Sequence, residues 1–98
     1  MVDIIKMDYG QMEDMAQAFA QGAQTLEALT SEVNQIATML ENGGLRGEAG
    51  DAFSEALRGV LNPAVQRLHD KFLELQGDIL GALDDMRSAD QDTTRLYG

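Results

Sequence analysis

Apolar residues recur every three or four positions along both halves of the chain, and this spacing predicts two long helices. In the first half the repeating positions are Met12, Met15, Phe19, Gly22, Leu26, Leu29, Val33, Ile36 and Leu40. In the second half they are Phe53, Leu57, Val60, Ala64, Leu68, Phe72, Leu75, Ile79, Ala82 and Met86. A sustained seven-residue repeat is typical of helices packed side by side at a shallow angle. We therefore predict an all-α fold with helices over about residues 8–42 and 49–89.

The ends of both predicted helices carry recognisable signals. Asp8 and Gln11 have the spacing of a capping box, which begins a helix, and Asn42-Gly43 is a typical helix stop. The second helix is expected to begin between Glu48 and Asp51. Pro63 lies inside the second pattern and would clash with the carbonyl of the residue four positions earlier. Because the apolar phase continues past it, we expect a kink and not a break.

Four glycines, Gly43, Gly44, Gly47 and Gly50, fall within eight residues between the two patterns. Such a cluster lets the backbone reverse, so the sequence predicts an antiparallel two-helix hairpin. In that register Gly22 faces Phe72, a small residue opposite a bulky one. Residues 1–98 are expected to form one domain, with residues 91–98 as a flexible tail because the periodicity ends there.

Composition excludes several classes of function. The 98 residues include 17 acidic and 7 basic side chains, for a formal net charge of -10, which disfavours binding to nucleic acid or anionic lipid. The chain has no cysteine, so disulfides and thiolate metal sites are unavailable. No apolar run reaches the roughly 18 residues of a membrane span. The first residues do not resemble a signal peptide, so any export is expected to proceed without a cleaved one.

No residue pattern predicts catalysis, a metal site or a cofactor. His69 is the sole histidine and has no second ligand or nucleophile at a suitable spacing. The glycines around Arg46 match neither a P-loop nor a dinucleotide fingerprint. The acidic residues near the end of the second helix are expected to form a solvated face. We therefore expect no enzyme.

A lone two-helix hairpin shields little apolar surface, so association is expected. Leu61, Val65 and Leu80 lie off the main pattern and are the candidates for an interface. A second hairpin packed there would complete a four-helix bundle. The partner would be a second copy of the chain or a related helical hairpin.

The turn resembles that of the WXG (Trp-X-Gly) family of ESAT-like proteins, which are exported by type VII secretion systems. The chain has Leu45-Arg46-Gly47 at this place, followed by Ala49 and Phe53. The resemblance covers nearly the whole chain, with Leu45 in place of the family's tryptophan. It implies a helical hairpin, a dimer, and a non-enzymatic protein that is cytoplasmic before export and secreted afterwards.

A second resemblance concerns the export signal, in which the family has a tyrosine followed four residues later by an acid. Met86 and Asp90 have this spacing, with Met86 in place of the tyrosine. Tyr9 and Glu13 also have the spacing but lie at the start of the first helix. The resemblance implies a dimer that presents this signal to a secretion ATPase. Two alternatives are an adaptor or targeting chaperone for the helical N-terminal region of a larger exported toxin, and a cytosolic coiled-coil scaffold.

Overall fold

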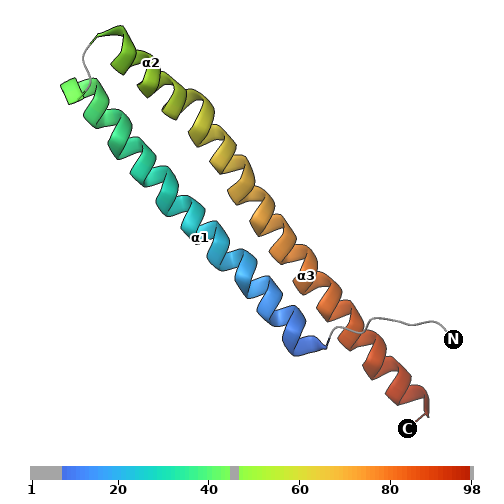
Figure 1. Ribbon diagram of the computed structural model, residues 1–98. Coiled ribbons are helices and arrows are strands. Elements are labelled where there is room, and N and C mark those ends of the chain that lie inside the picture. The colour runs from blue at the N-terminus through green and yellow to red at the C-terminus, as the bar shows by residue number, and fades with distance from the viewer. Residues whose placement is uncertain (1–7, 45–46, 98) are drawn as a thin grey trace, which may run out of the picture.

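A computed structural model of the protein describes residues 8–44 and 47–97, which form a rod-shaped antiparallel helical hairpin (Figure 1). The rod measures 74 × 24 × 16 Å. Its first arm is α1 (Tyr9–Met39), followed by the wide turn η1 (Leu40–Gly44). The second arm consists of α2 (Glu48–Ala56), the π-turn η2 (Leu57–Leu61) and α3 (Asn62–Tyr97), which run on without a break. The predicted all-helical hairpin is confirmed for the described residues.

The capping box at the start of α1 is confirmed. The Asp8 carboxylate accepts a 2.7 Å hydrogen bond from the backbone N–H of Gln11, and the Gln11 side chain accepts one of 3.2 Å from the backbone N–H of Asp8. At the other end Gly43 adopts φ +99°, a left-handed conformation that favours glycine and ends the helix. Local sequence signals therefore determine both ends of the first arm.

The second arm contains a π-turn where a kink at Pro63 was expected. The backbone N–H of Asn62 bonds to the carbonyl of Leu57, five residues earlier. This pattern inserts one extra residue into the helix. It widens the turn just before Pro63, where a regular α-helix would meet the clash of the proline ring with the carbonyl of Gly59. The helix thus passes the proline without ending.

The seam of α1 differs from the predicted one. Its buried residues are Met12, Ala16, Ala23, Val33 and Ala37. The predicted seam residues Met15, Leu29 and Ile36 are 37%, 39% and 49% exposed. Three of these five residues are alanines, which let the two helices approach closely and combine with larger side chains in interdigitated packing. The larger apolar residues beside them are therefore displaced to one flank.

The seam of the second arm also corrects the prediction. Gly50 and Ser54 are buried before the π-turn, and Val65 and Leu83 after it. Phe53, Val60 and Leu68, which were expected in the seam, are 56%, 69% and 46% exposed. Because the π-turn adds one residue, the seam continues after it in a phase that an uninterrupted seven-residue repeat does not predict.

The predicted register of the hairpin is confirmed at its centre. A Cβ atom built on Gly22 would lie 2.6 Å from Cε2 of Phe72, so the ring rests directly against the glycine backbone. The ring of Phe19 meets Phe72 edge to face, with centroids 5.3 Å apart and an interplanar angle of 82°. The two phenylalanine rings, packed against Gly22, form the centre of the seam.

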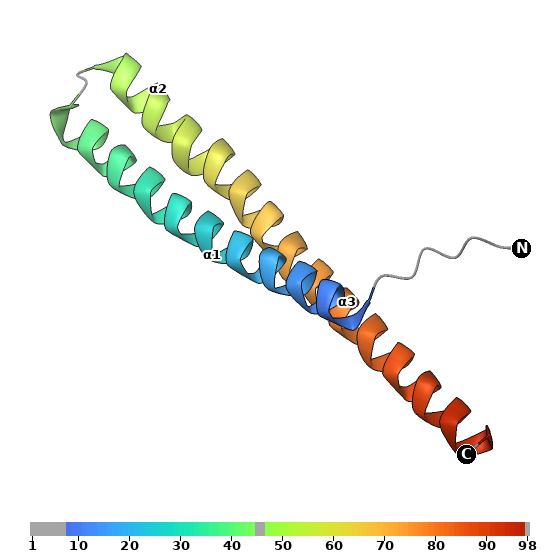
Figure 2. The same cartoon turned by 60° about the horizontal axis from the view of Figure 1, so that its bottom comes forward.

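The end of α3 is helical as far as Tyr97, which includes most of residues 91–98, the predicted flexible tail. The flexibility of this tail stays a prediction. Between Gly81 and Gly98 the chain has neither glycine nor proline, so no strong stop signal interrupts the helix. As Figure 2 shows, the last turns of α3 project beyond the start of α1.

Candidate functional site

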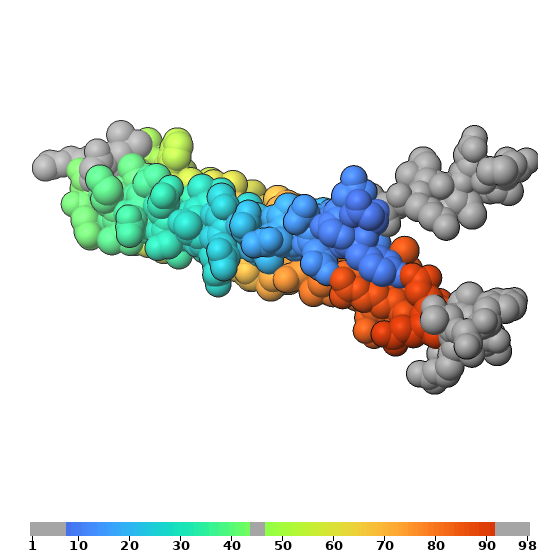
Figure 3. Space-filling view, turned by 90° about the horizontal axis from the view of Figure 1, so that it is seen from below, coloured from blue at the N-terminus to red at the C-terminus, as the bar shows by residue number. Residues whose placement is uncertain are grey.

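The first turn of α1 lies beside residues 86–90 of α3 at the end of the rod opposite the glycine turn (Figure 3), which we call the open end. There the hydroxyl of Tyr9 donates a hydrogen bond to Oδ2 of Asp90. The same hydroxyl lies 3.4 Å from the backbone carbonyl oxygen of Met86. The contact joins residues 81 positions apart in the sequence and holds the two helices together.

An arginine lies over the Tyr9 ring at the open end. The guanidinium carbon of Arg87 lies 5.1 Å from the ring centroid, within the range of a cation–π interaction. Arg87 also forms an ion pair with Glu13 of α1. The two side chains are 46% and 51% exposed, so the cluster is accessible from solvent.

The structure brings together the two predicted signal residues and a third that the sequence did not assign. Met86, which is 39% exposed, and Asp90 lie one helical turn apart and both contact Tyr9. In the sequence, Tyr9 and Glu13 lie at the start of the first helix, far from Met86 and Asp90. In an antiparallel hairpin, however, the start of the first helix lies beside the end of the second. The antiparallel register predicted from the sequence could therefore have identified Tyr9 as a neighbour of Met86 and Asp90.

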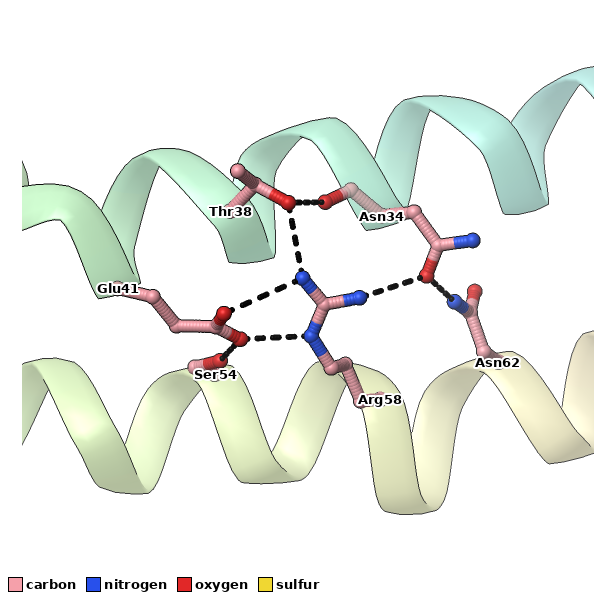
Figure 4. A network of polar contacts seen from close by, with 6 residues as sticks. All are labelled: Asn34, Thr38, Glu41, Ser54, Arg58 and Asn62. Carbon is pink, nitrogen blue, oxygen red and sulfur yellow. Dashed lines mark hydrogen bonds and ion pairs between the residues drawn. The ribbon is translucent and has the colours of Figure 1, made fainter.

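One flank of the hairpin is closed by a polar network, drawn in Figure 4, that the sequence did not predict. Arg58, in the π-turn, donates from Nε to Oε1 of Glu41 at 2.6 Å, and from Nη2 to Oγ1 of Thr38 at 2.9 Å. Its Nη1 donates to Oδ1 of Asn34 at 3.2 Å, and the same oxygen accepts from Asn62 at 2.7 Å. The one arginine therefore bonds to Asn34 and Thr38 of α1 and to Glu41 of η1.

Hydrogen bonds from Arg58 and Ser54 hold the pKa of Glu41 below its usual range. The Ser54 hydroxyl, which is buried in the seam, donates to Oε1 of Glu41 at 2.6 Å. Both donors stabilise the ionised carboxylate, so the network favours a charged Glu41. Glu13 and Arg87 lie on the same flank, because Glu13 and Glu41 are separated by four repeats of seven residues. We call this side the closed flank.

The opposite side, which we call the open flank, exposes a band of apolar side chains from both arms. On α1 the positions 15, 29 and 36 share this side at multiples of seven residues, and on the second arm the positions 61, 68, 75 and 82 do so. Before the inserted residue of η2 the same side is reached one position earlier, at 53 and 60. The large apolar residues of the band that are more than a third exposed are Met15, Leu29, Ile36, Phe53, Val60, Leu61 and Leu68. The band extends over most of the length of the hairpin.

The three interface candidates from the sequence do not share one surface. Leu61 lies on the open flank and is 41% exposed. Val65 is buried in the seam at 7% exposure. Leu80 is 44% exposed but lies on the closed flank, seven residues before Arg87 and seven after Leu73. The seam therefore separates Leu61 from Leu80.

Of the turn motif, Leu45 and Arg46 lie outside the described residues. Gly47 adopts φ +83° and ψ −158°, a conformation accessible almost only to glycine. Its carbonyl accepts a 3.2 Å hydrogen bond from the backbone N–H of Asp51 and so opens α2. The glycine of the motif is therefore required by the backbone.

The described part of the chain shows neither a metal-binding cluster nor a membrane-spanning helix. Those residues contain no group of three or more histidines, cysteines or acids that could hold a metal ion. Of the helices that they form, none combines the length and the apolarity that a bilayer crossing demands. His69 pairs instead with Asp70, its Nδ1 lying 3.0 Å from Oδ1, and this hydrogen bond lowers the pKa of Asp70.

Comparison with known proteins identifies one family. The sequence model of WXG100, described as proteins of 100 residues with WXG, matches residues 4–91. No curated protein and no solved structure matches the chain. Proteins of this family are secreted, non-enzymatic substrates that typically pair with helical partners, which is consistent with a small type VII secretion substrate. The matched range includes the first arm, the turn, and the second arm as far as residue 91, and with it the Met86–Asp90 segment.

Proposed function

Because the chain belongs to the WXG100 family, we propose that it is a type VII secretion substrate that acts as a dimer. In this proposal the open end, with Met86 and Asp90, presents the export signal to the secretion ATPase. The protein is cytoplasmic before export. The observation that supports the dimer is the open flank, a band of exposed apolar side chains on one side of a two-helix rod.

The closed flank and the open flank differ in the kind of surface that a partner would cover. On the closed flank Arg58 and Glu41 already pair with each other, so a partner there would cover satisfied polar groups. On the open flank a partner would remove exposed leucine, methionine and phenylalanine side chains from water, which drives association. A second hairpin packed on this side completes a four-helix bundle. We therefore assign the interface to the flank of Leu61 and not to that of Leu80.

A second candidate is an adaptor that pairs with the helical region of a larger exported protein. The charge of the chain favours it, because two copies at -10 each would bring a formal total of -20 into one bundle. A less acidic partner with an apolar face would avoid that repulsion. The open flank would serve this partner equally well.

Light scattering on purified variants tests the interface. We expect the wild type to have twice the mass of one chain and Leu61→Asp to shift it to a monomer, because a charge would be buried at the interface. Leu73→Asp on the closed flank is the matched control, since Leu73 is 43% exposed against 41% for Leu61. A wild-type monomer that associates only with a larger exported protein would favour the adaptor. A dimer that survives Leu61→Asp would contradict the assigned flank.

Export itself is tested with the full chain in a host that has an active type VII system. We expect the wild type in the culture medium and Asp90→Asn retained in the cells. Cell lysis is monitored with a cytoplasmic marker, and folding of the variant by circular dichroism. Absence of wild-type export, alone or with a partner, would reject the proposed function.

A further inference from the structure

We propose that Tyr9 is the aromatic member of the recognition surface at the open end, so that α1 and α3 build this surface together. The inference rests on the proposed function, which assigns Met86 and Asp90 to presentation of the signal. It adds a residue from the opposite end of the sequence. The partner would therefore recognise the folded hairpin and not the end of α3 alone.

The position of the phenol is the first argument. Met86 and Asp90 are four residues apart and so lie on one face of α3. The Tyr9 hydroxyl bonds to the Asp90 carboxylate and lies 3.4 Å from the Met86 carbonyl, so it spans that helical turn. On this turn α3 itself supplies a thioether and a carboxylate. The aromatic ring and its hydroxyl come from α1.

The surroundings of the ring are the second argument. The guanidinium carbon of Arg87 lies 5.1 Å from the ring centroid, and its ion pair with Glu13 of α1 holds the guanidinium over the ring. Half-exposed ion pairs of this kind contribute little to folding. Close by, Met12 and Leu83 are 9% and 3% exposed and already close the seam. The main effect of the polar cluster is thus to hold a ring and a carboxylate in one fixed arrangement.

This arrangement specifies the chemistry of its partner. The surface offers a phenol, the half-exposed side chain of Met86, and the negative charges of Glu13 and Asp90, which already accept from Arg87 and Tyr9. A complementary protein groove would combine an apolar pocket with arginine or lysine donors. The negative charge of the whole chain would speed the encounter with such a basic groove.

Transfer of the phenol from α1 to α3 tests the inference. In the export assay we expect Tyr9→Ala to reduce secretion at least tenfold. The double variant Tyr9→Ala/Met86→Tyr should restore it to within about threefold of wild type, because residue 86 lies next to the lost phenol. The secretion of Tyr9→Phe should fall between that of Tyr9→Ala and that of the double variant. The proposal would be overturned if Tyr9→Ala were secreted at the wild-type level, or if the double variant did not restore secretion.

A matched control separates recognition from simple clamping of the helix end. Asp8→Ala removes the capping box and loosens the same turn of α1 while it keeps the phenol. We expect its secretion to stay within about twofold of wild type. Equal losses in Asp8→Ala and Tyr9→Ala would show that the cluster acts only as a clamp and would also overturn the inference. A different result would reject the proposed function itself: a wild-type protein that is exported neither alone nor together with a partner.

Discussion

Gly22 of α1 lies directly against the phenyl ring of Phe72 on α3. The phenylalanine ring occupies the space that any side chain at position 22 would need, since a Cβ there would meet Cε2 at 2.6 Å and Cδ2 at 2.7 Å. Phe19 holds the ring from another side, edge to face. The glycine therefore sets how closely the helices pack at the centre of the rod.

Gly22→Ala should destabilise the protein by about 1–2 kcal/mol, because overpacking of a core costs more than the gain in helix propensity. Thermal unfolding followed by circular dichroism at fixed protein concentration measures the change. In a Phe72→Ala background the ring is absent, and the same substitution should become neutral or stabilising. Additive effects of the two substitutions would show that the ring does not press on Gly22.

Alanine substitutions at Gly47 in the turn and at Gly77 in α3 should change the stability of the protein in opposite directions. Gly47 has φ +83°, so Gly47→Ala should cost about 1–3 kcal/mol of stability. Gly77 has open space around its Cβ position within a regular helix, so Gly77→Ala should stabilise by about 0.5–1 kcal/mol. Denaturant unfolding of both variants gives the comparison. A loss in Gly77→Ala as large as that in Gly47→Ala would refute the conformational explanation.

The π-turn predicts that one residue can be deleted from η2 without changing the seam. Removal of Val60, with Pro63→Ala to avoid the ring clash, should convert η2 to regular α-helix. Gly50, Ser54, Val65 and Leu83 then keep their faces, and stability should change by less than about 1 kcal/mol. Circular dichroism and thermal unfolding measure the outcome.

Deletion of Asp78 in the same Pro63→Ala background is the control for this experiment. It rotates every later residue by about 100°, so the buried Leu83 would leave the seam. We expect a loss of several kcal/mol, as for other large changes in a core. Similar stability of the two deletion variants would disprove the inserted-residue description of the π-turn.

The free energy of unfolding should decrease at acidic pH, in part because Glu41 becomes protonated. Its pKa is lowered in the folded protein by the hydrogen bonds from Arg58 and Ser54. A lowered native pKa stabilises the fold fully at any pH above the ordinary glutamate pKa. The contribution is lost as pH falls from there through the native pKa. Glu41→Gln should therefore flatten the decline of stability with acid, as measured by denaturant unfolding at several pH values.

Arg58→Met is the companion variant for the pH experiment. It removes the main cause of the lowered pKa and should flatten the same part of the profile. The double variant should show no further change, because both substitutions remove one interaction. A full acid decline in the Arg58→Met protein would contradict the role given to the network.

The sequence was sufficient for features that depend on neighbours along the chain or on an unbroken repeat. Asp8 and Gln11 identified the start of α1, and Gly43 identified its end. The pairing of Gly22 with Phe72 followed from the length of the turn. These features rest on short-range hydrogen bonds, backbone conformation and helix geometry, all of which local sequence encodes.

Only the tertiary structure decided which apolar stripe is buried and what meets at the open end. Two neighbouring stripes on α1 were both apolar, and close approach of the helices selected the alanines at 16, 23 and 37 over the larger residues beside them. The π-turn shifted the phase of the second arm by one residue, which periodicity alone does not reveal. The contact of Tyr9 with Asp90 likewise exists only because an antiparallel hairpin brings the two ends of the sequence together.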